Sequence, residues 1–174
     1  YPTSEPQLQL RLPTERYYEE EGRAELTPRD FGILMHRVFE NAATTDEIYT
    51  AIEAMTQDGV LDEKEAPRLR ELVEKALADP VTAEWFGGRW QVVRNENEII
   101  LPGSGTTRRP DRVMTDGERA VVVDYKFGDR ETARHRKQIR EYLHLLRQMG
   151  HTRTEGYLWY VRLGRTERVE EKED

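Results

Sequence analysis

Hydrophobic residues recur at helical spacing through the first half of the chain. The first run begins at Thr27 and Pro28, two residue types typical of a helix start. Its apolar positions are 31, 34, 35, 38, 39 and 42. Three further helical patterns cover residues 44–59, 62–80 and 79–86. We therefore expect residues 24–88 to be mainly helical, after a polar entry or linker segment over residues 1–23.

The pattern changes to β-branched and alternating residues after position 88. Strand patterns, separated by Pro-Gly and Asp-Gly turn signals, cover residues 89–100, 106–115 and 119–127 and predict an antiparallel run. A helix over 131–149 and strands over 155–163 and 165–171 follow. This order predicts one α/β or α+β domain over residues 24–174, whose core over 89–170 is a central mixed sheet flanked by helices.

Composition narrows the chemistry that the chain can perform. The formal net charge is −7, the wrong sign for gripping nucleic acid by bulk electrostatics, so a polyanion has to be held locally or delivered by another component. The sequence contains no cysteine, which excludes disulfides, thiolate zinc sites and cysteine-ligated iron–sulfur clusters. Any metal chemistry must therefore use oxygen and imidazole ligands.

Targeting signals are not found in the sequence. No apolar run approaches the ~20 residues that span a bilayer, and the N-terminus has neither the basic nor the apolar part of a signal peptide. We expect a cytoplasmic protein with no membrane partner. Because the chain does not begin with Met, we also expect it to be part of a larger protein.

Acidic residues stand at the ends of two predicted strands. Val121–Val123 run directly into Asp124, Tyr125 and Lys126, and alternation along a strand places Asp124 and Lys126 on one face. Asp111 lies on a segment that can pair with this strand. Two carboxylates that converge repel each other unless a cation lies between them, and oxygen ligands suit Mg²⁺ or Mn²⁺. The alternative is an ordinary surface ion pair, either Asp124 with Lys126 or Asp111 with Arg112.

The stretch "RPDRV", a thirteen-residue step and then "VVVDYKFGD" resemble the core of the PD-(D/E)XK nucleases. The likeness is to the nuclease domain at the C-terminus of RecB- and AddA-type helicase-nucleases, the type of the exonuclease V beta subunit. It extends to "GILMHRVFE" with His36, to "QIREYLHLL" with Gln138 and Tyr142, and to an acidic residue before the first Asp, at Glu96 or Glu98. These motifs follow one another in the family's order.

The resemblance implies a restriction-endonuclease-like fold and a set of roles. Asp111, Asp124 and Lys126 would be catalytic. His36, the two aspartates and the Tyr125 carbonyl would hold Mg²⁺ or Mn²⁺. Glu96, Gln138, Tyr142 and Arg112 would support the site or contact DNA. The resemblance also implies that ATP is used only by a helicase part outside this chain, that a second subunit can take part, and that the substrate is DNA with single-stranded or unwound ends.

Each of these residues also has a structural alternative. His36 can be an ordinary exposed helical histidine, and Tyr142 can be a core residue with Gln138 at its polar edge. A basic rim is expected around the site, formed by arginines and a lysine at positions 108, 109, 112, 130, 134, 136 and 137. The tryptophans and nearby tyrosines are better explained by core packing than by base stacking.

Two functions follow as hypotheses. The first is a divalent-metal-dependent DNA nuclease domain, an exonuclease of an ATP-dependent helicase-nuclease in recombination and repair. The second is a nuclease-like fold kept as a DNA-binding or scaffolding module without catalysis. A Cas4-like nuclease ranks below both because that type carries cluster-binding cysteines, which are missing here.

Overall fold

The structure is a computed structural model that describes residues 25–95, 99–100, 107–128 and 133–172. Its helices are α1 (Pro28–Glu40), α2 (Thr45–Gln57), α3 (Ala66–Ala76), α4 (Pro80–Trp85), α5 (Ala133–Gln148) and the short 3-10 helix η1 (Val161–Leu163). Its strands are β1 (Val92–Asn95), β2 (Ile99–Ile100), β3 (Thr107–Arg108), β4 (Arg112–Asp116), β5 (Arg119–Lys126), β6 (Arg153–Tyr160) and β7 (Arg165–Arg168). The predicted helices and their order are confirmed. The predicted strands over 89–100 and 106–115 each divide into two shorter strands, and residues 161–163, predicted as the end of a strand, form η1.

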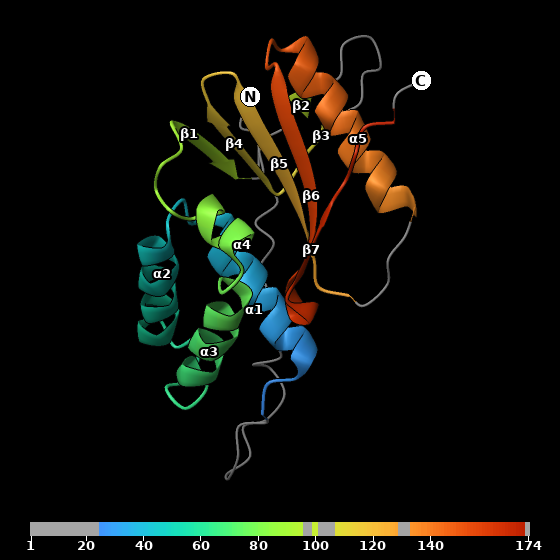
Figure 1. Cartoon of the computed structure of the whole chain (residues 1–174). Coiled ribbons are helices and arrows are strands. Elements are labelled where there is room, and N and C mark those ends of the chain that lie inside the picture. The colour runs from blue at the N-terminus through green and yellow to red at the C-terminus, as the bar shows by residue number, and fades with distance from the viewer. Residues whose placement is uncertain (1–24, 96–98, 101–106, 129–132, 173–174) are drawn as a thin grey trace, which may run out of the picture.

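Five strands form one mixed sheet in the order β1-β4-β5-β6-β7, and β2 and β3 form a separate pair. β1, β4 and β5 pair antiparallel, as the sequence predicts, while β5 and β6 are parallel because α5 carries the chain back across the sheet. Helices α1–α4 gather on one side of the sheet and α5 lies on the other (Figure 1). The expected mixed α/β class, with a restriction-endonuclease-like core, is confirmed.

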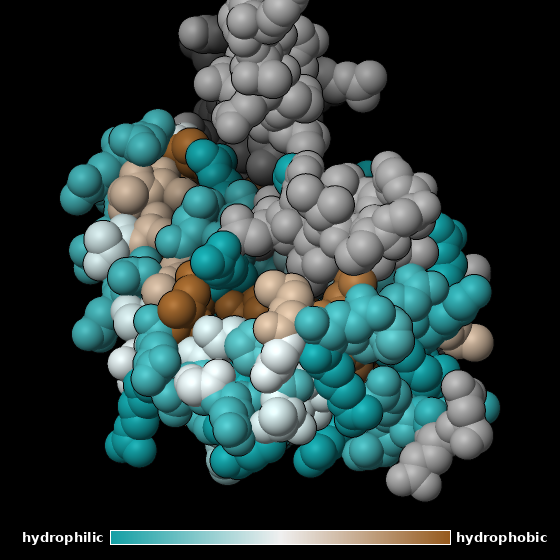
Figure 2. Space-filling view, turned by 90° about the horizontal axis from the view of Figure 1, so that it is seen from above, coloured by the Kyte–Doolittle hydropathy of each residue, from teal (hydrophilic) through white to brown (hydrophobic). Residues whose placement is uncertain are grey.

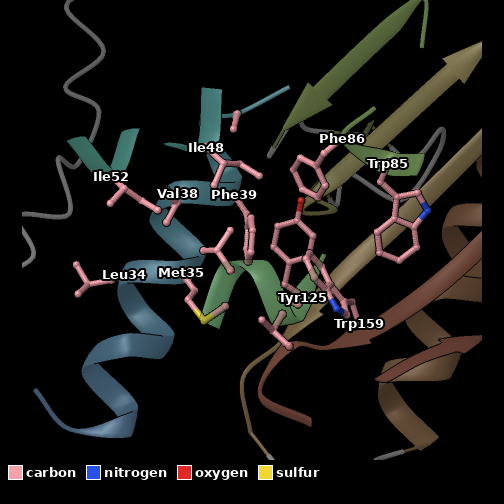
Figure 3. Packing of buried hydrophobic residues seen from close by; sticks show 14 of the residues in the cluster. Leu34, Met35, Val38, Phe39, Ile48, Ile52, Trp85, Phe86, Tyr125 and Trp159 are labelled. Atoms are coloured by element: carbon pink, nitrogen blue, oxygen red, sulfur yellow. The ribbon is translucent and has the colours of Figure 1, made fainter. Parts of the chain in front are cut away.

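The central strand β5 is buried on both faces. Val121, Val123 and Tyr125 pack into the cluster formed with α1–α4, whereas Ala120 and Val122 pack against α5. The rings of Phe39 in α1, Trp85 in α4 and Tyr125 surround Trp159, and the Tyr125 ring lies 5.4 Å from it (Figure 3). The sheet is therefore held firmly between two apolar layers at the strand that carries Asp124 and Lys126.

The large aromatic residues belong to this core. Trp85 and Trp159 are almost completely buried, and so is Tyr160. The Trp85 and Trp159 rings contact each other edge to face with centroids 5.6 Å apart. The interpretation of these residues as packing residues is confirmed.

The layer of α5 lies very close to β6 at Gly156. A Cβ atom at this position would be 2.4 Å from Cγ2 of Ile139 and 3.2 Å from both δ-carbons of Leu143. Only glycine allows the helix to approach the strand so closely. This contact sets the position of α5 over the parallel strands β5 and β6.

Arg112, at the start of β4, is fully buried and joins several elements. Nη1 donates to the carbonyl of Ala42 at 2.7 Å, and Nη2 donates to the carbonyls of Ala43 at 2.8 Å and Trp85 at 2.7 Å. Nη1 also donates to Oδ1 of Asn95 at 3.1 Å. The guanidinium thereby ties the α1–α2 turn and the end of α4 to the sheet.

The surface is largely polar. The face seen in Figure 2 is covered mainly by hydrophilic residues, as 35% charged residues predict. Within the described residues, the exposed large hydrophobic side chains are Val92, Met149 and Leu163. None of the helices in this part of the chain combines the length and the apolarity needed to cross a membrane.

Replacing Arg112 by Met should lower the free energy of unfolding by roughly 3 kcal/mol or more, because two buried carbonyl groups and one part-buried carbonyl group lose their donor. Arg112→Lys should also destabilise, since one ammonium group cannot reproduce the guanidinium fork. Urea denaturation measures both. The control is Arg94→Met on the neighbouring strand, where the side chain is exposed. An Arg112→Met protein as stable as this control would contradict the assigned role.

Candidate active site

The two aspartates meet where the ladder between β4 and β5 ends. The last paired residues at this end are Arg112 and Val123. One step further, the Asp111 amide donates to Oδ1 of Asp124 at 3.3 Å, and the Tyr125 amide donates to Oδ2 of Asp111 at 2.6 Å. Beyond the last ladder pair, these backbone amides bond to carboxylates instead of to backbone carbonyls of the facing strand. The predicted convergence of the two carboxylates is confirmed.

Lys126 shares its face of β5 with Asp124. Its Nζ lies 3.4 Å from Oδ2 of Asp124. The Asp124 side chain is only 6% exposed, so this pair is not the solvated surface ion pair of the alternative interpretation. Burial and the negative charge of Asp111 raise the pKa of Asp124, and Lys126 opposes part of that increase.

His36 reaches the same place from α1. Its Nε2 lies 3.3 Å from Oδ1 of Asp111, a residue 75 positions away, and its Nδ1 lies 3.0 Å from Oε2 of Glu40, one turn further along the helix. The ring contacts Phe127 edge-on with centroids 5.6 Å apart. His36 is therefore a half-buried partner of Asp111 and not an ordinary exposed histidine.

Two carboxylates surround the His36 imidazole. The hydrogen bond to Asp111, followed by the one to Glu40, raises the pKa of His36 to about 10, against the opposing effect of burial. In the metal-free protein the ring is therefore an imidazolium near neutral pH. A metal ion is coordinated only by a neutral ring, so coordination by His36, which stays a prediction, would require the loss of this proton.

The donor set suits a hard divalent cation. Among the described residues, no three His, Asp or Glu side chains already stand as a cage around a metal position. Magnesium needs only one or two carboxylates, and water and substrate oxygens complete its shell. Asp111 and Asp124 meet that requirement, with His36 beside them. The predicted Glu96 and its alternative Glu98 lie outside the described residues.

Tyr125 contributes to the core through its ring and to the site through its backbone amide. Its ring is buried in the core on the opposite face from Asp124, as alternation predicts, and its backbone amide holds Asp111. Burial raises the pKa of its hydroxyl group, which lies beside Arg112. The Tyr125 carbonyl as a metal ligand stays a prediction.

Gln138 and Tyr142 lie one turn apart on α5 and contact each other. Gln138 Nε2 donates to the Tyr142 hydroxyl oxygen at 3.0 Å. Tyr142 is fully buried in the cluster between α5 and the sheet, and Gln138 is half-buried. The core interpretation of Tyr142 is thus confirmed, and a DNA contact through Gln138 stays a prediction.

The basic rim is only partly as expected. Including Arg112 in it is wrong, because its side chain is fully buried against backbone carbonyls. Arg136 is ion-paired with Glu167 of β7, with Nη2 at 3.2 Å from Oε2. Arg134 and Lys137 are exposed near the start of α5. Arg130 and the side chain of Arg108 lie outside the described residues.

Some neighbours of the site were not predicted as site residues. Phe127 packs against His36, and nothing in its spacing signals this contact. Glu40 is one turn after His36, a spacing that does signal a contact. His135 on α5 is close enough to Lys126 for that charge, after burial, to lower the pKa of its imidazole. The site is thus bordered by α1 on one side and by the start of α5 on the other.

Comparison with known families agrees with this geometry. The profile of the PD-(D/E)XK nuclease superfamily matches residues 7–174, nearly the whole chain. The chain belongs to this superfamily. Membership implies phosphodiester hydrolase activity on DNA, and nucleases of this superfamily generally use divalent metals such as Mg²⁺. A search of curated proteins finds no significant match.

The raised pKa of His36 predicts a pH-dependent contribution to stability in the metal-free nuclease. The contribution is fully present below the ordinary pKa of 6.5, declines as pH rises, and is lost above about 10. The difference in free energy of unfolding between the wild type and His36→Gln should therefore be larger at about pH 6 than at about pH 9. Urea denaturation with a chelator present measures it. A difference that grows with pH would contradict the assigned charge state.

Proposed function

We propose that residues 24–174 form a divalent-metal-dependent DNA exonuclease domain of the RecB/AddA type. The observation that carries the proposal is the meeting of Asp111 and Asp124 at the end of β5, beside Lys126 and against His36. A catalytically inactive binding module has no need of this combination. The order of these residues along the chain matches the helicase-linked type of nuclease.

The residues divide the work of hydrolysis among them. Asp111 and Asp124 would hold Mg²⁺ or Mn²⁺, with His36 as a further ligand once it has lost its proton. The ion, when bound, supplies an activated water and positive charge for the phosphate. Lys126, whose side chain is 20% exposed, can donate hydrogen bonds to a phosphate oxygen on the same face as Asp124.

A helicase partner accounts for the overall charge. A chain with a net charge of −7 attracts DNA poorly by itself. A helicase motor, in the parent chain or a second subunit, would feed unwound strand ends into the site. The nuclease domain then needs little affinity for DNA of its own. We therefore place the nuclease in cytoplasmic recombination and repair, with ATP consumed only by the motor.

Asp124→Asn and Lys126→Ala should each lower the rate of DNA cleavage about 100-fold or more, since each removes a group placed beside the scissile phosphate. Cleavage of linear single-stranded DNA with Mg²⁺ or Mn²⁺ is the measurement. Asp116→Asn makes the same change at the exposed opposite end of β4 and should cut at the wild-type rate. Full activity of Asp124→Asn would contradict the assignment of this site, whereas no cleavage by the wild type would support the inactive-module hypothesis.

An exonuclease also requires a strand end. Linear single-stranded DNA should be degraded, whereas a circular strand of the same sequence should survive under the same conditions. Gel electrophoresis of both substrates, with the Asp124→Asn protein as a blank, tests this. Equal cleavage of the circle would show an endonuclease.

A further inference from the structure

A cavity of about 390 Å³ lies between α1, α3 and η1. In Figure 1, η1 follows β6 and lies beside the first turns of α1. Apolar walls come from Phe31 and Met35 of α1, Leu72 of α3 and Leu163 of η1. Leu163 is 51% exposed, an unusual degree for a leucine in this structure. We call this cavity the α1–η1 groove.

The groove carries positive charge in an acidic chain. Arg68, Lys75 and Arg162 line it, and none of the described residues along its walls is acidic. The Arg68 guanidinium lies over the Phe31 ring, 4.6 Å from its centroid, so this cation is held at the apolar wall. Lys75 is shared with Glu71, 3.0 Å away on the outer surface of α3. The groove therefore suits a ligand that combines negative charge with apolar surface.

One wall of the groove leads directly to the active site. Gly32 lines the groove and precedes His36 by four residues, about one helical turn or roughly 6 Å along α1. Phe127 bridges the two places: a Cβ on Gly32 would lie 3.5 Å from the Phe127 Cβ, and the Phe127 ring contacts His36. The groove is therefore adjacent to the candidate active site on the His36 side.

The other wall of the groove continues from the parallel strands β5 and β6. Lys126 is paired with Tyr160 in the parallel ladder of β5 and β6. Val161, the next residue, lines the groove and opens η1. Both walls therefore extend from elements that carry or neighbour the proposed catalytic residues.

We propose that the α1–η1 groove binds the single strand of DNA next to the scissile phosphate. This inference rests on the proposed nuclease function. One helical turn corresponds to about one to two nucleotides of a stacked strand, which advances about 3.4 Å per nucleotide. Arg68 and Arg162 contact phosphates, and the apolar wall that includes Leu163 receives an unstacked base.

A single strand fits this groove better than a duplex does. The bases of a single strand are exposed and bind apolar and aromatic surfaces, whereas a duplex keeps them stacked inside. A cavity of about 390 Å³ is at the small end of the range for sites that enclose a small molecule. It therefore accommodates a nucleotide and not a double helix.

The test compares DNA binding by charge-reversal variants in an Asp124→Asn background, which prevents cleavage. Arg68→Glu/Arg162→Glu reverses two exposed cations of the groove, and Arg153→Glu reverses an exposed cation at the far end of β6. Fluorescence anisotropy with a labelled oligothymidylate gives Kd over a range of salt concentrations. Thermal denaturation of each protein verifies the fold.

The groove variant should bind the oligothymidylate about tenfold more weakly, with a salt slope that is flatter by roughly 1.4 for two lost phosphate contacts. Arg153→Glu should bind within about twofold of the background protein, as expected for a residue that contacts no phosphate. Leu163→Asn, which adds no charge, should weaken single-strand binding as well, and this tests the apolar wall independently of the arginines.

Three results would overturn the inference. Equal DNA binding by the groove variant and by Arg153→Glu would show that the DNA strand does not bind in the groove. An acidic protein segment would then be the favoured ligand of the groove. An equal loss with a duplex of the same length would remove the single-strand preference. No measurable binding of the oligothymidylate by the background protein would also refute it. DNA cleavage by the unsubstituted chain tests the nuclease function separately.

Discussion

The buried guanidinium of Arg112 is the interaction on which the rest of the arrangement depends. It links the α1–α2 turn, the end of α4 and β1 to the first residue of β4, through bonds to Ala42, Ala43, Trp85 and Asn95. Because Asp111 is the preceding residue and His36 lies on α1, this cation fixes the histidine relative to the carboxylate. Its hydrogen bonds to Ala42, Ala43, Trp85 and Asn95 all go to carbonyl or amide oxygens, so these dipoles and the Phe86 ring 4.0 Å away stabilise its charge.

The site keeps like charges together at the edge of a low-dielectric core. Asp124 is buried behind Val123 and adjacent to Asp111, a combination that is unfavourable unless positive charge is close. Lys126 and the protonated His36 supply that charge. If Asp111, Asp124 and His36 held a divalent cation, the cation would supply it instead, and Lys126 could donate hydrogen bonds to a phosphate. Lys126 could thus bind an anion locally, although the chain as a whole is acidic.

Periodicity and motif order predicted much of the structure. The alternation of Val121–Val123 with Asp124 and Lys126 correctly gave the faces of β5, and the spacing of Asp111 correctly gave its convergence with Asp124. Arg112 was wrongly included in the basic rim, because a cation beside an acidic motif looks the same in sequence whether it faces solvent or backbone carbonyls. The Phe127–His36 contact and the α1–η1 groove depend on how α1 docks against the sheet, and this long-range packing has no local signature.

The three parts of the site come from very different distances along the chain. Asp111 and Asp124 are 13 residues apart on one hairpin, whereas His36 and Asp111 are separated by 75 residues. Local contacts form faster in folding than distant ones. The hairpin of β4 and β5 by itself contains the two acids and Lys126 but not the histidine, which comes from α1. The complete constellation therefore requires the helical layer docked on the sheet as well as the hairpin.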